Sequence, residues 1–271
     1  MKKFLAILLA AGLVGSLSGF TAKDDPAEVY EQAMAKSLEA GSQQMDCGMA
    51  MTLRYGAQTL EIGMDFDAQV VRDGEGYQMA MTGSLDLLGQ QLPMELYYLD
   101  NWCYMDVLGQ KVKTRMPLDQ MLALTGAQAS TLSPVPYMEK LTLEPQGEQA
   151  QLTYRIPQAA MIRYFEDVLA ATGPALTPEE QAQMEMVKLG SMDGTLVVDG
   201  EYNTLSEDAR MNLFLYVGED VIPCTLRMAV DYSPLAAGTQ LQFPADLASY
   251  PTEEQLAAQV AAQQAAAQPA A

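Results

Sequence analysis

The most constraining feature of the sequence is an alternation of apolar and polar side chains, with a period of two, between residues 45 and 115. In the stretch 60–70 every even-numbered position is apolar, whereas the odd-numbered positions carry Glu61, Gly63, Asp65, Asp67 and Gln69. Such alternation gives a strand one buried and one solvated face, which is typical of antiparallel sheets. Together with turn signals between the stretches, it predicts a six-stranded meander, with strands near residues 45–55, 59–72, 77–88, 91–99, 102–108 and 111–115.

The rest of the chain mixes helical and strand patterns. Asp25 and Pro26 are typical of a helix start, and Gly41 ends the helical spacing that follows. A capping motif at Thr252 predicts a last helix. Further elements are expected as helices near 117–124, 157–172 and 177–189, a hairpin over 141–144 and 151–156, and strands near 191–199, 208–217 and 222–232.

These elements fit one α+β domain over residues 23–250, followed by an Ala/Gln-rich C-terminal tail at 251–271. We expect a single curved, mostly antiparallel sheet that stays open as a half-barrel. Helices are expected to cover its concave face, because each helix must bury its apolar side.

The N-terminus has the features of an export signal. Lys2 and Lys3 precede an apolar stretch at residues 4–14, and small residues follow at 15–19. The apolar stretch is too short and too interrupted for a spanning helix. We therefore expect residues 1–22 to be a signal peptide and the protein to be extracellular or associated with the cell surface. The pattern leaves open whether the signal is cleaved or retained as an anchor.

Composition excludes several classes of function. The chain has no histidine, so catalytic triads and metal centres that need an imidazole are excluded. A formal net charge of −20 repels phosphate backbones, which argues against nucleic-acid binding. Cys47, Cys103 and Cys224 lack metal-ligand spacing, so we expect no metal and no cofactor. They are interpreted as small apolar side chains, and the alternative that one pair forms a disulfide stays open.

Two groups of acidic residues were considered as sites. Asp65 and Asp67 share the solvated face of one predicted strand, at a spacing that any such pair would have. A second group lacks the glycine of a calcium-binding loop and is better explained as a solvated acidic hairpin; its members are Asp199, Glu201, Asn203, Glu207 and Asp208.

The order of elements resembles a known superfamily. An N-terminal helix and a Met-rich meander precede the segment at residues 100–113, whose sequence is DNWCYMDVLGQKVK, and a glycine-led strand follows at 194–199. This plan is similar to that of the LolA/LppX-like superfamily, which includes many Gram-positive surface lipoproteins of unknown function. The resemblance implies an open half-barrel whose apolar cavity, capped by helices, holds acyl chains. Phe20 stands where the lipid-modified cysteine of a lipoprotein would be.

Methionine is the most unusual component of the sequence, with 19 in 271 residues. Its flexible, polarizable side chain suits a surface that adapts to several ligand shapes, and it also fills irregular cores. Aromatic residues around Trp102 are candidates for a cavity mouth or for cross-strand packing. The candidate cavity-lining residues are Met49, Met51, Met64, Phe66, Met79, Met81, Met94, Trp102, Tyr104 and Met228.

From these features we expect a non-enzymatic, exported envelope protein that binds a lipid, an acyl chain or another hydrophobic ligand as a carrier or sensor. The alternative is a cell-surface module that docks a protein partner without a small ligand. A third hypothesis, hydrolysis of wall glycan by paired carboxylates, has the weakest support, because no pair of acidic residues is distinguished by its spacing. The oligomeric state stays open.

Overall fold

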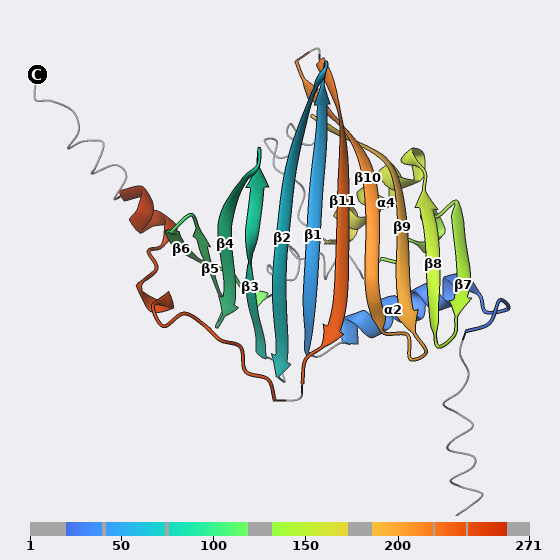
Figure 1. Ribbon diagram of the computed structural model, residues 1–271, viewed down its shortest axis with the longest axis horizontal. Coiled ribbons are helices and arrows are strands. Elements are labelled where there is room, and N and C mark those ends of the chain that lie inside the picture. The colour runs from blue at the N-terminus through green and yellow to red at the C-terminus, as the bar shows by residue number, and fades with distance from the viewer. Residues whose placement is uncertain are drawn as a thin grey trace, which may run out of the picture.

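The computed structural model describes residues 20–39, 42–73, 76–118, 132–172, 186–218, 220–236 and 238–258. They build an eleven-stranded antiparallel sheet with helices on one side (Figure 1). The strands are β1 Ser42–Tyr55, β2 Gln58–Asp73, β3 Gly76–Leu87, β4 Gln90–Leu99, β5 Trp102–Val107, β6 Gln110–Arg115, β7 Lys140–Gln146, β8 Gln149–Ile156, β9 Val187–Asp199, β10 Thr204–Val217 and β11 Asp220–Pro234. The helices are α2 Pro26–Glu39 and α4 Gln158–Thr172, with 3-10 turns η2 Val135–Tyr137 and η3 Leu247–Ser249.

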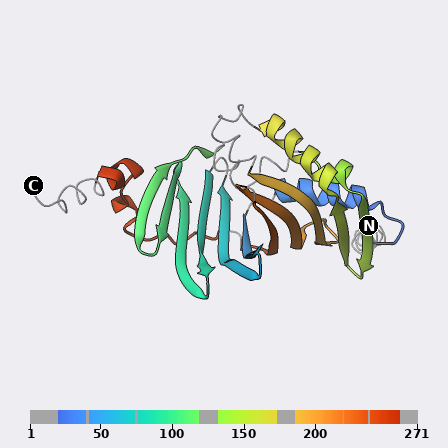
Figure 2. The same ribbon diagram turned by 90° about the horizontal axis from the view of Figure 1, so that it is seen from above.

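The sheet consists of two meanders joined in its middle. Its order is β6-β5-β4-β3-β2-β1-β11-β10-β9-β8-β7, so the first and last strands of the chain pair with each other. The outermost strands β6 and β7 lie at opposite edges, and the curved sheet stays open (Figure 2). The predicted single, open, antiparallel sheet of an α+β protein is therefore confirmed.

Cross-strand register defines two faces of the sheet. One row of directly opposed residues runs from Leu196 on β9 through Glu207, Val230 and Cys47 to Phe66 on β2. Opposed residues share a face, and neighbours along a strand point to opposite faces. We call the face that carries this row the helix face, because α2 and α4 pack against it, and the other the outer face.

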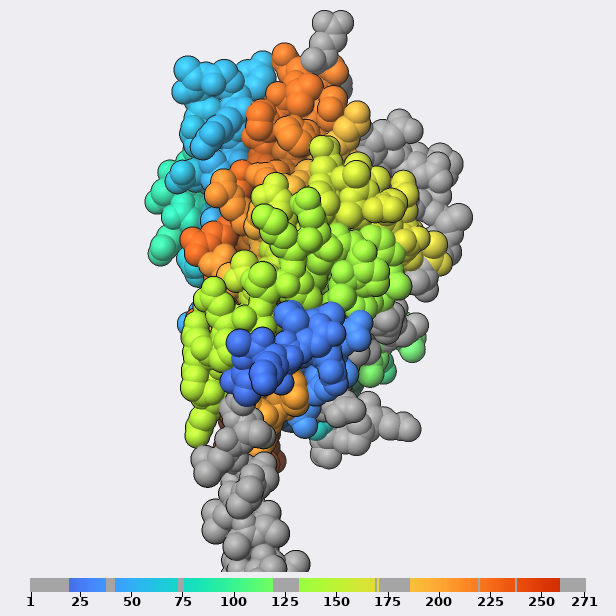
Figure 3. Space-filling model, turned by 90° about the vertical axis from the view of Figure 1, so that its right-hand side faces the viewer, coloured from blue at the N-terminus to red at the C-terminus, as the bar shows by residue number. Residues whose placement is uncertain are grey.

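The described helices α2 and α4 cover the half of the helix face formed by β7–β10 (Figures 1 and 2). Asp25 caps α2 as predicted, since its Oδ1 accepts the N–H of Ala27 at 2.9 Å. Tyr30 of α2 then packs edge-to-face on Tyr154 of β8, with ring centroids 5.9 Å apart. At the β7 edge, α2 lies beside the β7–β8 hairpin (Figure 3). This half contains the largest core of the protein.

The C-terminal segment covers part of the outer face at the other edge. Tyr250 is buried and packs on Tyr104, with ring centroids 5.9 Å apart. The backbone N–H of Lys113 on β6 donates to the carbonyl of Pro251 at 2.8 Å. This contact pairs part of the exposed edge strand, which would otherwise offer free backbone groups. The predicted cap at Thr252 is present, because its hydroxyl accepts the N–H of Gln255 at 3.3 Å.

One predicted helix was wrong at its end. The pattern placed a helix up to residue 189, but Val187 already begins β9 and pairs with Leu215 of β10. The carbonyl of Met186 also accepts the N–H of Tyr216 at 2.8 Å. Pairing with β10 therefore overrides the local helical spacing. The remainder of that helix, and nearly all of the one at 117–124, lie outside the described residues.

Gly83 on β3 provides a test of the tight contact between β2 and β3. An added Cβ would overlap the backbone oxygen of Asp65 and would come within 2.6 Å of the Cβ of Phe66. We predict that Gly83→Ala lowers the free energy of unfolding by about 1–3 kcal/mol, because the backbone of β2 must shift. Gly63→Ala is the matched control, since its Cβ would meet only the Cβ of Asp86 at 3.5 Å. Urea unfolding of both variants checks this, and equal stabilities would contradict it.

Candidate functional site

The central strands carry a methionine-rich apolar surface on the helix face. Met228 of β11, Met49 of β1 and Met64 of β2 are directly opposed across three neighbouring strands. The row continues through Leu85 of β3 to Leu92 of β4. We call this area the methionine surface and define it by Met49, Met51, Met64, Phe66, Met81, Met94 and Met228.

The methionine surface is uniformly apolar but incompletely buried. Every side chain that β1 places on the helix face over residues 45–53, and β2 over residues 60–70, is apolar. Its seven defining residues are partly exposed, in contrast to Leu152 and Val198 under the helices, which are fully buried. Met79, also a predicted site residue, is buried in a separate small cluster with Tyr98 and Cys103. The sequence thus placed eight of the ten candidates on one face.

The other two candidates lie on the opposite face. Trp102 pairs with Leu99 and Tyr104 pairs with Tyr97, whereas the neighbouring residues Tyr98 and Cys103 lie on the helix face. Trp102 and Tyr104 therefore share no face with the methionines and are not part of the methionine surface. Tyr104 instead contributes to packing of the C-terminal segment, as the cross-strand alternative anticipated.

Glu207 is the one carboxylate that the register places in the row across the helix face. It lies on β10 opposite Leu196, partly buried, where the helix-covered half meets the methionine surface. The hydroxyl of Tyr154 donates to its Oε1 at 3.2 Å. Burial raises the pKa of Glu207, and the hydrogen bond from Tyr154 partly opposes that shift. The interpretation of Glu207 as part of a solvated hairpin was wrong, because pairing with β9 turns it inward.

The tyrosines around Glu207 respond to the same environment. Burial raises the pKa of Tyr154, and the nearby Glu207 raises it further. Burial and the charge of Glu207 likewise raise the pKa of Tyr30 on α2 and of Tyr232 on β11. These hydroxyls stay protonated at neutral pH and can serve as hydrogen-bond donors. The group therefore forms a polar boundary to the apolar surface.

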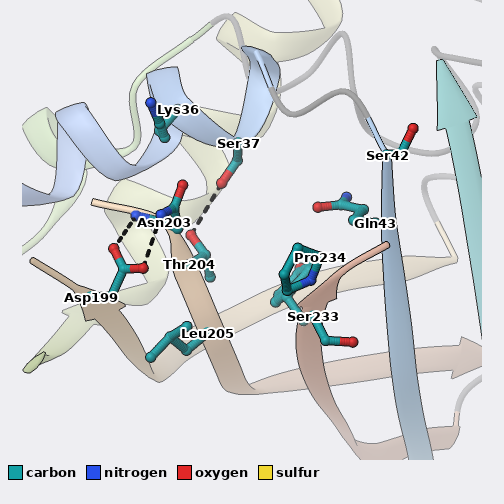
Figure 4. A pocket seen from close by; sticks show the side chains of 11 residues that line it. Lys36, Ser37, Ser42, Gln43, Asp199, Asn203, Thr204, Leu205, Ser233 and Pro234 are labelled. Carbon is teal, nitrogen blue, oxygen red and sulfur yellow. Dashed lines mark hydrogen bonds between the residues drawn. The ribbon is translucent and has the colours of Figure 1, made fainter. Parts of the chain in front are cut away.

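A pocket of about 280 Å³ lies at the end of the sheet beneath the C-terminal turn of α2 (Figure 4). Ser37 of α2 and Thr204 of β10 hydrogen-bond across it at 3.1 Å. Asp199 lines it too, but both its oxygens already accept bonds from Asn203, each at 2.9 Å. Asp199 therefore organises the β9–β10 turn. The sequence analysis interpreted Asp199 and Asn203 as members of a solvated acidic hairpin, and it gave no signal of a pocket.

The remaining candidate groups have ordinary structural roles. All three cysteines are buried and unbonded, and burial, followed by the charges of Asp46 and Asp67, raises the pKa of Cys47 to about 11. Such a thiol is a poor nucleophile at neutral pH. Asp65 and Asp67 are exposed on the outer face, as predicted.

Within the described ranges, no cluster of three His, Cys, Asp or Glu is arranged to hold a metal. Nor is any described helix long and apolar enough to cross a membrane.

The sequence was compared with known families and structures. The model of a family described as "Family of unknown function (DUF6612)" matches residues 25–249. The chain belongs to this family. No curated protein matches the sequence.

Solved structures similar to this DUF6612 protein include LprF from Mycobacterium bovis, at 10% identity and a TM-score of 0.44, covering 81% of this chain and 97% of that one. A LolA superfamily protein from Nitrosomonas europaea is 10% identical, with a TM-score of 0.27 over 83% of this chain and 96% of that one. A lipoprotein-sorting domain from Vibrio parahaemolyticus is 9% identical, with a TM-score of 0.28 over 82% and 97%. The expected open antiparallel sheet, with the described helices α2 and α4 on one face, is present in the structure itself.

Glu207 gives a pH-dependent prediction. Because its folded-state pKa is raised above the unfolded value, the wild type loses stability as the pH rises from the unfolded pKa through the folded one. Glu207→Gln keeps an acceptor for Tyr154 without a charge. We predict that the variant is more stable than the wild type at pH 7, because it removes a charge that burial disfavours. The difference should vanish near pH 3, where both side chains are neutral. Chemical unfolding at both pH values checks this, and a variant less stable at pH 7 would contradict it.

Proposed function

We propose that this DUF6612 protein is an exported envelope protein that binds a lipid or another hydrophobic ligand on its methionine surface, as a carrier or sensor and without catalysis. One observation carries the proposal. The surface is apolar across the five strands β11, β1, β2, β3 and β4 and is partly exposed, whereas α2 and α4 pack over β7–β10. Contiguous exposed apolar surface of this kind is typical of sites that meet a ligand or partner.

The chemistry of the surface supports a ligand of variable shape. Six of its seven defining residues are methionines, and these six lie on five different strands. Their unbranched side chains can rearrange around an acyl chain without a change in the backbone. Each methylene removed from water contributes roughly 0.8 kcal/mol. An acyl chain along the surface would therefore bind appreciably with no polar contact.

The proposed location agrees with this ligand class. The features of residues 1–22 favour export, and the envelope is where a lipid ligand would be met. The alternative, a module that docks a protein partner, would use the same apolar surface. The two functions differ in whether the purified protein retains a small hydrophobic molecule.

Two adjacent positions on β3 offer a matched test. Met81 lies on the helix face opposite Ala68, and Thr82 lies on the outer face opposite Asp67. We predict that the wild type, exported and purified without detergent, shows discrete added masses in native mass spectrometry, which disappear after organic extraction. Met81→Gln should reduce this occupancy about tenfold, because it places an amide against the ligand. Thr82→Gln should leave the occupancy unchanged.

Folding of both variants is checked by circular dichroism and thermal unfolding. Equal occupancy in Met81→Gln and the wild type would contradict binding at the methionine surface. A wild type with a clean mass, unchanged after incubation with mixed lipids, would overturn the ligand proposal and favour the protein-docking alternative.

A further inference from the structure

Large apolar side chains are exposed at one end of the sheet. β1, β3, β5 and β10 run towards this end and turn back there as β2, β4, β6 and β11 (Figure 1). Tips of two of these hairpins, β1–β2 in light blue and β10–β11 in orange, stand at the top of Figure 3. We call this end the hairpin rim and define it by its exposed residues Tyr55, Leu87, Leu88, Leu108, Val217 and Val221. The most exposed is Leu88, at 74%.

Two neighbouring turns of the rim share both sequence and geometry. The β3–β4 turn reads DLLGQ over residues 86–90, and the β5–β6 turn reads DVLGQ over 106–110. Leu88 and Gly89 have φ of 57° and 80°, and Leu108 and Gly109 have 58° and 77°. Two-residue turns with both φ positive strongly favour Asn-Gly or Asp-Gly. Leucine is disfavoured there, because its Cβ crowds the following carbonyl.

A turn at the opposite end shows that the fold does not require leucine. The β4–β5 turn has the same pattern of positive φ, with Asp100 at 53° and Asn101 at 62°. Its residues are the polar ones that tolerate this conformation. The β7–β8 turn at that end is also polar, with Gly147 and Glu148 at its tip. Leu88 and Leu108 are thus unfavourable for the turn and for solvation, which points to a role outside the fold.

We propose that the hairpin rim docks on the surface of a neutral lipid bilayer, with Leu88 and Leu108 inserted at the boundary between headgroups and acyl chains. The apolar side chains stand on separate hairpin tips, and a bilayer accepts such tips without a complementary shape. The rim is also continuous with the methionine surface, since Leu85 and Leu87 extend the helix face of β3 into it. A lipid leaving the bilayer at the rim would meet apolar side chains along its whole path.

The charged residues near the hairpin tips are compatible with docking of the rim on a bilayer. Asp86 accepts the N–H of Gly89 at 2.8 Å, and Asp220 accepts the hydroxyl of Tyr55 at 3.1 Å. Asp106 lies 3.9 Å from the ammonium group of Lys111. Each of these three carboxylates therefore has a partner, which lowers the cost of approaching a medium of low dielectric constant. The net charge of −20 opposes anionic lipids, so the bilayer is neutral and the attraction is hydrophobic.

The test is co-flotation of the exported protein with phosphatidylcholine vesicles. We predict that the wild type binds and that the double variant Leu88→Asn/Leu108→Asn binds about tenfold more weakly, because two apolar insertions are lost. Asn-Gly is the preferred pair for these turns, so thermal unfolding of the double variant should be unchanged or shifted upward. Glu148→Asn, at a tip on the opposite end, is the control and should bind as the wild type does.

Further arms separate the alternatives. Replacing a third of the phosphatidylcholine with phosphatidylglycerol should weaken binding, since an acidic protein is repelled by anionic lipid. A wild type that fails to float with phosphatidylcholine, or a double variant that binds equally, would overturn the proposal and leave the rim to a protein partner. Ligand occupancy of the wild type and Met81→Gln is measured separately, by native mass spectrometry. Ligand binding on the methionine surface and bilayer docking by the hairpin rim can therefore fail independently of each other.

Discussion

Pairing between β1 and β11 is the interaction on which the rest of the structure depends. It joins the two meanders through eleven opposed pairs, from Gln43 with Pro234 to Leu53 with Cys224. Its register places Met49 opposite Met228, and so aligns the apolar faces of the two halves. A slip of one residue would turn the methionines of one half to the outer face. The methionine surface exists because this long-range register is held.

The sheet divides into a packed half and an open half. Over β7–β10 the helices α2 and α4 bury a continuous core that includes Leu152, Tyr154 and Val198. Over the central strands the same face is only partly buried. Glu207 lies at the boundary, and its raised pKa reflects burial from the packed side. The largest buried core of the described residues thus lies in one half, and the proposed binding surface lies in the other.

The outer face is where the C-terminal segment packs. It is polar over the central strands, and the C-terminal segment crosses it to the β6 edge. There Lys111 forms an ion pair with Asp246 at 2.6 Å, and Lys113 pairs with Pro251. These contacts hold the edge strand of the open half, and Thr114 of β6 also donates to Glu253 at 2.7 Å. The C-terminal segment therefore stabilises, from the outer face, the sheet whose helix face carries the methionine surface.

Much of the fold followed from local patterns, and the errors came from long-range pairing. The meander strands were predicted within about three residues, because alternation and turn signals are properties of neighbouring residues. The face of Trp102 could not be predicted, since its orientation depends on how the β4–β5 turn pairs it with Leu99. The predicted helix end at 189 gave way to pairing of Val187 with β10.

By itself, the sequence determined the alternating strands, the capped start of α2 at Asp25, and the concentration of methionine on one side of each strand. Only the tertiary structure decided which side faces the helices, that Glu207 turns inward, and that the turns with Leu88 and Leu108 lie at the same end of the sheet. Alternation fixes the two sides of a strand relative to each other. The direction of either side is set by strands that are distant in the chain, and their register is not written in any local segment.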